Sequence, residues 1–322
     1  MNSNECVDDL SCNFLSDLLV FLINFPKKTM AMDVMAVENI IQKAIGSKSE
    51  VVNLSHRNIK VLSNNVSQLT HVIRLLLNDN EILMPPTEIT QLLQLQELVL
   101  NNNKLTMLPH GVGKLQNLTY LNLCGNPLGF LPDEFCDLIN LHQLWLVNCQ
   151  LKSLPNDIGN LKSLEKFSVR ENALRSLPKS FYNLISLHWL CLAENMFEEL
   201  SSEFKDFKQL TYLNLNYNCL AEVPSCVLEM SELVTLLLKN NVIKTVSDDT
   251  ILGLAKLTKF DLRDNMIDIK PDHWKGLDYI LMGKSGLDED VSVDDDVEED
   301  DDEDEEEEDD DSENNETDET KK

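Results

Sequence analysis

The sequence predicts an α/β solenoid, in which short repeats stack and their parallel strands form one sheet. One observation is an asparagine that recurs every 23 residues, and a second is a proline with the same period. The third is the leucine pattern LxxLxLxxN that leads to each asparagine. A fixed period of this length indicates units that bury their apolar faces against their neighbours. The two series are Asn80, Asn103, Asn126, Asn172, Asn195, Asn218 and Asn241, with Cys149 in the one gap, and Pro86, Pro109, Pro132, Pro155, Pro178 and Pro224.

An N-terminal extension, residues 1–32, precedes the repeats and contains an apolar run at residues 14–25. These twelve residues are too few to cross a bilayer, which takes a helix of about 20. Acidic residues come before the run and lysines after it, whereas a signal peptide has a basic leader. We expect a short helix or a poorly ordered extension here. The alternative is that Met30 or Met32 is the start of the working protein.

Residues 33–49 are expected to form an N-terminal cap helix. Apolar residues follow helical spacing from Val34 to Ile45, and Gly46 is a stop signal. The first repeat of a solenoid would otherwise expose its apolar end to water, so a cap is required at this place.

Ten repeats are expected over residues 50–270. Within each, apolar and polar residues alternate as in a strand with one buried face. Leu118, Leu121 and Leu123 are expected to point inward, and the following Asn126 to bond backbone groups at the turn. One such asparagine per repeat predicts a ladder. The strands are expected near residues 50–55, 73–77, 96–100, 119–123, 142–146, 165–169, 188–192, 211–215, 234–238 and 258–262.

The C-terminal end of the array departs from the period. Asn265 lies 24 residues after Asn241, and we place the extra residue in a loop around Asp248–Thr250. Residues 271–287 are expected to close the array as a C-terminal cap, with a helix that contains Trp274, Leu277, Ile280 and Leu281.

The last segment, residues 288–322, is expected to be a disordered acidic tail. It holds 24 acidic residues against Lys321 and Lys322, a net charge of −22, which leaves −7 of the total of −29 for the rest of the chain. A segment with this composition buries too little apolar surface to fold.

The repeats resemble the intracellular leucine-rich repeat class of 23-residue units with an LPxxhxxLxxLxxLxLxxN core. That class includes the plant intracellular Ras-group-related proteins, the Ras-suppressor proteins, the soc-2-type Ras-pathway scaffold and the Scribble-like polarity proteins. The resemblance covers residues 50–270. It implies a horseshoe with parallel strands on its concave face, and it implies that this face binds other proteins.

The residues that the repeat pattern leaves free on the concave face are the candidates for function. Trp, Tyr and Arg dominate the energetic hot spots of protein interfaces. We therefore predict a partner-binding site, with the alternative that Trp145 packs on neighbouring side chains along the sheet. The site is centred on Tyr120, Trp145, Arg170, Trp189, Tyr212 and Tyr217.

Catalytic, cofactor and metal sites are not predicted. The sequence has no glycine-rich phosphate loop, nucleophile elbow or paired histidine–carboxylate helix motif. His142 and His188 share a register but lie two repeats, about 10 Å, apart, too far to share a metal ion. Scattered cysteines without a CxxC pair are typical of a reducing compartment.

Two functions remain open at this point. The first is a non-catalytic adaptor or scaffold that binds a protein on its concave face, in small-GTPase or phosphatase signalling, in the cytoplasm. The alternative is a nuclear acidic chaperone or regulator that binds histones or other basic proteins through its tail. The polyanionic tail disfavours direct contact with nucleic acid. No transmembrane segment is expected.

Overall fold

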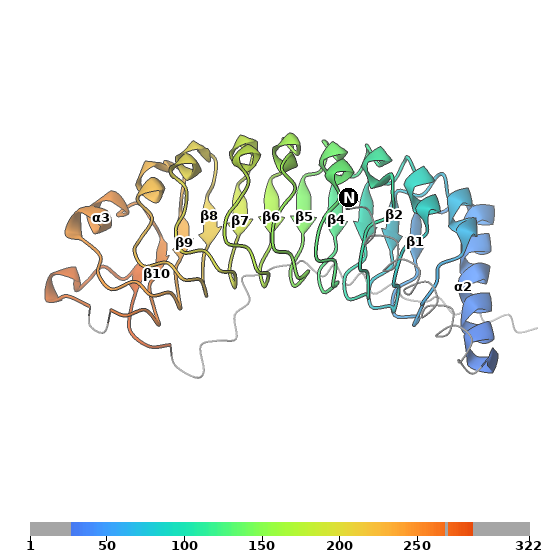
Figure 1. Cartoon of the computed structure of the whole chain (residues 1–322), viewed down its shortest axis with the longest axis horizontal. Helices are drawn as coiled ribbons and strands as arrows, with labels where there is room; N and C mark the ends of the chain where they lie inside the picture. The colour runs from blue at the N-terminus through green and yellow to red at the C-terminus, as the bar shows by residue number, and fades with distance from the viewer. Residues whose placement is uncertain (1–26, 268–269, 286–322) are drawn as a thin grey trace, which may run out of the picture. The chain divides into compact units, whose positions relative to one another are not determined.

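The computed structural model describes residues 27–267 and 270–285. One parallel sheet of eleven strands runs through this part of the chain in sequence order (Figure 1). Each repeat is numbered here by its strand. The strands are β1 (Val51–Asn53), β2 (Arg74–Leu76), β3 (Glu97–Val99), β4 (Tyr120–Asn122), β5 (Gln143–Trp145), β6 (Lys166–Ser168), β7 (Trp189–Cys191), β8 (Tyr212–Asn214), β9 (Thr235–Leu237), β10 (Lys259–Asp261) and β11 (Ile280–Leu281).

Register between neighbouring strands follows the sequence period. Tyr120 pairs with Gln143 and Leu121 with Leu144, and the same 23-residue step joins every pair from β1 to β9. Residues at one position of the repeat therefore form columns along the sheet. The middle residue of each strand points to the core, as Leu121 does at 1% exposure.

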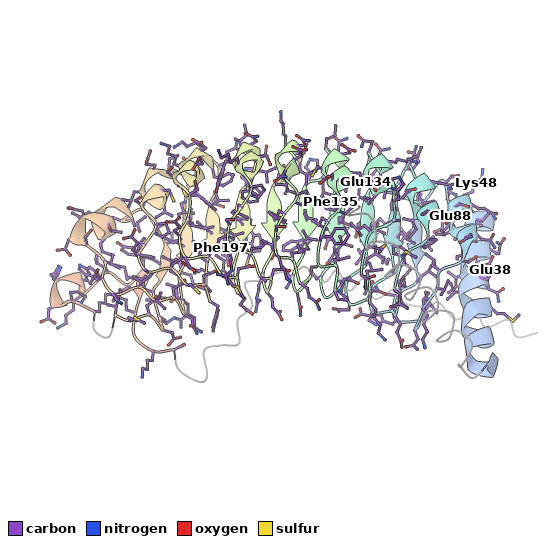
Figure 2. The ribbon with its side chains drawn as sticks, viewed as in Figure 1. Glu38, Lys48, Glu88, Glu134, Phe135 and Phe197 are labelled. Atoms are coloured by element: carbon purple, nitrogen blue, oxygen red, sulfur yellow. The ribbon has the colours of Figure 1, made fainter. Side chains whose placement is uncertain are left out.

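The opposite wall of the core is built from short 3-10 helices, which occupy one edge of the array in Figure 1. Phe135, Phe181 and Phe204 lie fully buried in this wall, as Figure 2 shows for Phe135. A Cβ on Gly159 would overlap the backbone carbonyl of Ser180 in the next repeat, so close stacking requires glycine there. The helices are η1 (Asn64–Gln68), η2 (Thr87–Gln91), η3 (Val112–Lys114), η4 (Asp133–Asp137), η5 (Ile158–Asn160), η6 (Lys179–Asn183), η7 (Ser202–Asp206), η8 (Ser225–Glu229) and η9 (Asp272–Trp274).

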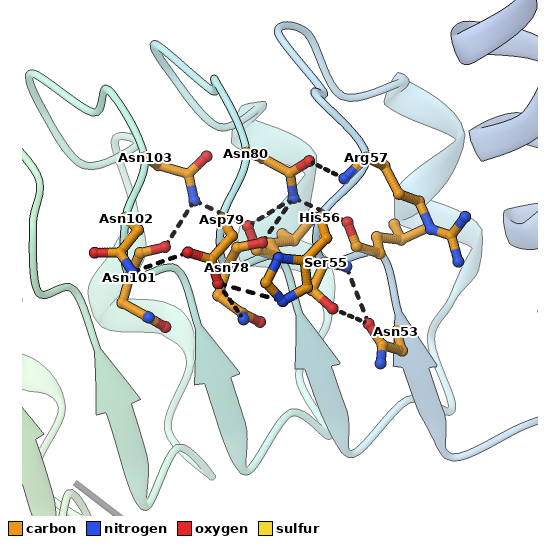
Figure 3. A network of polar contacts seen from close by, with 12 residues as sticks. Asn53, Ser55, His56, Arg57, Asn78, Asp79, Asn80, Asn101, Asn102 and Asn103 are labelled. Carbon is orange, nitrogen blue, oxygen red and sulfur yellow. Dashed lines mark hydrogen bonds and ion pairs between the residues drawn. The ribbon is translucent and has the colours of Figure 1, made fainter. Parts of the chain in front are cut away.

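The expected asparagine ladder is present. Asn80 Oδ1 accepts a bond from the Ile59 amide at 3.0 Å, and its Nδ2 donates to the carbonyls of Leu54 and Leu77 at 2.9 and 3.0 Å. Figure 3 shows this network at Asn80 and Asn103. The ladder ties each repeat to the one before it and pairs buried backbone groups that the turn leaves open.

Cys149 interrupts this ladder. Its thiol donates weakly to the Leu123 carbonyl at 3.3 Å but has no oxygen to offer to the preceding repeat. The Leu128 amide, which an asparagine would bond, instead donates to the carbonyl of Asn126 at 2.8 Å. The local backbone has thus changed to satisfy the donor that the missing asparagine leaves.

The N-terminal cap is helix α2 (Lys27–Ser47), which begins before the expected residue 33. Val37, Ile41 and Ala44 are buried against the first repeat. Glu38 also accepts a bond from Asn65 at 2.6 Å, so the cap is held by apolar and polar contacts.

The C-terminal end differs from expectation in two places. Residues 248–250 begin a helix, α3 (Asp248–Gly253), where a loop was expected. An α-helix takes 3.6 residues per turn where a 3-10 helix takes 3.0, and this accommodates the extra residue of that repeat. The Ser247 side chain accepts a bond from the Thr250 amide at 3.1 Å and starts the helix.

The array closes with an eleventh strand rather than with the expected helix over Trp274–Leu281. The amides of Phe260 and Leu262 donate to the carbonyls of Tyr279 and Leu281 at 2.7 and 2.8 Å. A helix here would leave these edge groups of β10 unpaired. The expected extension before residue 27 and the acidic tail at residues 288–322 lie outside the described residues.

Candidate protein-binding face

The open sheet face consists of the first and third residues of each strand, which point away from the core. Its centre carries an aromatic cluster made of Trp145, Trp189 and Tyr212. Trp189 and Tyr212 are register partners on β7 and β8, and their rings stack at 5.1 Å with an interplanar angle of 6°. Because parallel strands lie about 4.8 Å apart, such a stack requires both rings to stand upright on the sheet.

Trp145 reaches this cluster across an intervening strand. It is the third residue of β5, and its ring centroid lies 5.3 Å from that of Trp189 on β7. Strand β6 places the small Ser168 between them, at 1% exposure, and β7 adds the buried Cys191. Small side chains at the third strand position leave the room in which the large ring of Trp145 lies.

Trp145 packs against neighbouring side chains along the sheet, and its part in partner binding stays a prediction. Its side chain is on the open face, but the residue is only 3% exposed. Packing on neighbours along the sheet, the alternative considered from sequence, is what the structure shows. Trp145 Nε1 is buried without a hydrogen-bond partner among the described residues. Trp189 and Tyr212 are half-buried and present the accessible part of the cluster.

The other predicted site residues lie around this cluster. Arg170 follows β6 and pairs with Glu194 through Nε and Nη2 at 2.9 and 2.8 Å. Tyr217 lies in the turn after β8, where it is 41% exposed, and the Lys239 ammonium is 5.7 Å from its ring centroid. Tyr120 is half-buried at the start of β4, three strands before Trp189.

Paired charges occupy both ends of the open face. At the N-terminal end Arg74 Nε lies 2.6 Å from Glu97. At the C-terminal end Arg263 donates to Asp261 at 2.7 Å, and Asp261 is 2% exposed. Salt bridges at the ends and apolar rings at the centre match the usual plan of an interface, with a polar rim around an aromatic core.

Sequence reasoning missed the floor of the cluster, Ser168 and Cys191. Their signal is a small residue at the third strand position beside a repeat that has tryptophan there. Sequence reasoning also left open which of the predicted site residues would contact one another. The structure brings Trp145, Trp189 and Tyr212 together, and it places Tyr120 three strands before Trp189.

Two buried cysteines, Cys136 and Cys226, are not set up as nucleophiles. Burial raises the pKa of the Cys136 thiol to about 12 and that of Cys226 to about 11, so both are neutral thiols at pH 7. In residues 27–267 and 270–285, no group of three or more His, Cys, Asp or Glu side chains is placed to hold a metal ion. Among the same residues, no helix has the length and apolar character needed to cross a membrane.

Two family models match this array of repeats. The model "leucine-rich repeat region" matches residues 84–177, and the model "leucine rich repeat" matches residues 208–267. The fold is a leucine-rich repeat solenoid. Neither model indicates a catalytic family. No curated protein matches the chain.

Solved leucine-rich repeat structures share the fold. A leucine-rich repeat protein of Leptospira interrogans is 29% identical, with a TM-score of 0.54 over 76% of this chain and 81% of that one. The ectodomain of the Arabidopsis thaliana receptor kinase GASSHO1/SCHENGEN3, solved with CASPARIAN STRIP INTEGRITY FACTOR 2, is 26% identical with a TM-score of 0.59. That match covers 69% of this chain but only 28% of the ectodomain. The functional domain of InlJ from Listeria monocytogenes, at 20% identity and a TM-score of 0.58 over 75% of this chain and 56% of that one, shows the same fold.

Proposed function

We propose that the protein is a non-catalytic adaptor that binds a protein partner at the centre of its open sheet face. The observation that carries this proposal is the cluster of Trp145, Trp189 and Tyr212. Rigid aromatic side chains supply large contact areas at little cost in conformational entropy, and they dominate interface hot spots. Because Trp145 lies beneath Trp189, the proposal assigns direct contact to Trp189 and Tyr212 and a supporting role to Trp145.

The fold itself supports a binding role. Leucine-rich repeat proteins commonly mediate protein–protein interactions, and stacked repeats create an extended surface for the purpose. The finer assignment to cytoplasmic small-GTPase or phosphatase signalling rests on the resemblance of the repeat motif to Ras-pathway scaffolds. Arg170 and Tyr217 are assigned to the rim of the proposed site, and Tyr120 to its outer margin.

A second candidate is a nuclear chaperone or regulator of basic proteins. The net charge of −22 on residues 288–322 favours it, because a polyanion attracts histones and other basic proteins at low salt. The proposed partner site on the open face does not involve this tail.

One experiment separates the two candidates. Tagged full-length protein, the double variant Trp189→Ala/Tyr212→Ala and a chain that lacks residues 288–322 are purified from cells, and their co-purifying proteins are quantified. Loss of the two aromatic side chains should weaken the affinity for the principal partner at least about 30-fold. The reason is that truncation of a single hot-spot residue typically costs about 2 kcal/mol of binding free energy. The tail deletion should leave that partner unchanged.

The control is the double variant Ile139→Ala/Ile185→Ala. It also removes two exposed apolar side chains, but from positions beside the 3-10 helices. Partner recovery that survives the aromatic substitutions, and disappears with the tail, would contradict the adaptor and support the chaperone.

A further inference from the structure

A second apolar surface lies in the connection that follows the asparagine ladder, outside the open sheet face, and we call it the C-terminal stripe. It occupies the residue directly after the ladder asparagine in repeats seven to ten. Met196, Val242 and Met266 are 41, 36 and 54% exposed there. The fourth member, Cys219 in repeat eight, is an exposed free thiol.

The stripe is continuous because backbone hydrogen bonds join neighbouring repeats at this place. The amide of Cys219 donates to the carbonyl of Phe197, the residue after Met196, at 2.9 Å. The amides of Val242 and Met266 make the same bond to the repeat before them, at 3.0 and 2.9 Å. Chain segments bonded in this way lie about 4.8 Å apart, so three steps give a stripe about 14 Å long.

The repeat fold does not require apolar residues at this position. Repeats two and three place Glu81 and Lys104 there, and the amides of these residues make the same kind of backbone bond, at 2.8 and 3.0 Å. Their side chains pair with each other, with 3.0 Å between Lys104 Nζ and Glu81 Oε2. The apolar side chains of repeats seven to ten therefore serve no requirement of the fold. Contiguous exposed apolar side chains of this kind mark an interaction site.

Tyr217 connects the stripe to the open sheet face. It is 41% exposed and lies in the turn after β8, between Tyr212 of the aromatic cluster and Cys219 of the stripe. Asn218 and Leu220, on either side of Cys219, are buried, whereas Tyr217 and Cys219 both face solvent. Repeat eight therefore carries exposed apolar side chains from the proposed partner site to the stripe.

Carboxylates flank the stripe in repeats seven and eight. Glu199 and Glu222 occupy the same position of these two repeats, three residues after the stripe residue. Both are exposed, and among residues 27–267 and 270–285 neither has an ion-pair or hydrogen-bond partner. Glu198 pairs with Arg175 at 3.7 Å, and Lys244 follows the stripe residue of repeat nine by two residues. The negative end of the stripe is therefore at repeats seven and eight.

We propose that the partner bound at the open sheet face continues over the C-terminal stripe with an extended segment of apolar and basic side chains. This inference rests on the proposed function, because it gives the same partner a second region of contact. Apolar side chains of the segment cover the methionines, which adapt to irregular apolar surfaces. Its basic side chains lie at Glu199 and Glu222. A second copy of this chain fits poorly, because it would bring the same carboxylates, in a chain of net charge −29, to this surface.

Alkylation of Cys219 tests the contact. The full-length protein is purified with the principal partner that co-purifies with it, and labelling of Cys219 by iodoacetamide is followed by mass spectrometry in the complex and in the free protein. Labelling should be about tenfold slower when about nine-tenths of the molecules are in the complex, because only the unbound fraction exposes the thiol. The control Lys104→Cys places a thiol at the same position of repeat three, and it should react at the same rate in both samples.

The result for Cys219 is distinguishable from a failure of the proposed function. If Cys219 reacts equally fast with and without the partner, and Trp189→Ala/Tyr212→Ala still abolishes the complex, the contact at the stripe is overturned and the proposed function stands. If Trp189→Ala/Tyr212→Ala leaves the complex intact, the proposed function fails, and this inference fails with it.

Substitution of exposed stripe residues measures the apolar contact. Val242→Asp/Met266→Asp should weaken the affinity for the partner at least about tenfold, because a carboxylate in an apolar contact loses its hydration without gaining a partner. The control Glu81→Gln/Lys104→Gln changes the same position of repeats two and three and should bind as wild type does. Wild-type affinity in the stripe variant would overturn the proposal.

The basic character of the bound segment is measured separately. Glu199→Gln/Glu222→Gln should weaken the affinity about fivefold at low salt, since exposed ion pairs contribute up to about 1 kcal/mol. The difference from wild type should shrink as the salt concentration rises. An affinity equal to that of wild type at low salt would contradict a basic segment at this place.

Discussion

Repeats one to four and repeats five to eight differ at two positions that the fold leaves free. In repeats one to four, the exposed position between the asparagine ladder and the 3-10 helix is apolar, at Val61, Met84, Met107 and Phe130. In repeats five to eight that position is polar, and Trp145, Trp189 and Tyr212 gather on the open sheet face. The backbone and core are the same in both halves, so the difference lies in positions that the fold leaves free. It teaches that one scaffold can carry different surfaces without a change in its core.

The boundary between the halves coincides with the gap in the asparagine ladder. Phe130 is the last of the four exposed apolar residues, Trp145 is the first residue of the aromatic cluster, and Cys149 follows Trp145 by four residues. Here the Leu128 amide bonds within its own repeat instead of bonding the next one. The Gly129 amide donates to the carbonyl of Cys149 at 3.0 Å, so a backbone bond joins the two halves where an asparagine side chain would otherwise do so.

The largest effect is expected from Trp145→Ala. This residue is buried beneath the accessible rings, and large-to-small substitution of a buried aromatic side chain costs about 3 kcal/mol. Urea unfolding followed by circular dichroism measures the loss. Leu93→Ala, which removes an exposed apolar side chain from the half without the cluster, should cost less than about 1 kcal/mol. Equal losses would show that the cluster contributes no packing of its own.

A smaller effect is expected where the ladder is broken. Asn218→Ala removes an acceptor for the Phe197 amide and a donor to three backbone carbonyls, so it should cost about 2 kcal/mol. Cys149→Ala removes only weak thiol bonds and should cost less than about 1 kcal/mol. The pair is compared by urea midpoints under identical conditions. If Cys149→Ala and Asn218→Ala lower the free energy of unfolding equally, the ladder position at the boundary contributes as much stability as the positions within the halves, and the prediction is wrong.

The smallest effect is expected at the closing end of the array. Hydrogen bonds from His273 and Trp274 lower the pKa of Asp248. The stabilisation is therefore present above the unfolded-state pKa of about 3.9 and is lost as pH falls through the lower folded-state value. The Tm of wild type should exceed that of Asp248→Asn at pH 5, and the gap should close near pH 2. A constant gap would assign the difference to packing instead.

Much of the fold could be predicted because the repeat period determines register. Once Leu121 is inward, residues 23 positions away are inward too, and the asparagine ladder follows from the same spacing. The closing strand β11 could not be predicted, since Ile280 and Leu281 fit a helix and a strand equally well. Whether these two residues form a helix or a strand depends on the unpaired backbone groups that β10 presents at the edge of the sheet.

The candidate site was predictable only as a set of positions. Repeat spacing placed Trp145, Trp189 and Tyr212 on one face of the sheet, because successive strand residues alternate between faces. Which rings meet depends on the volume of the residues between them. Ser168 and Cys191 are small, so Trp145 leans across β6 and becomes buried, a result that alternation along one strand does not contain.

The sequence by itself therefore determined the repeat, the register and the identity of the free positions, since these depend on spacing along the chain. The tertiary structure alone decided which free positions are covered and which remain exposed. Trp145 and Phe130 are both large aromatic residues at free positions of neighbouring repeats, yet one is 3% and the other 57% exposed. The reason is that exposure depends on side chains from other repeats, which come together only when the chain has folded.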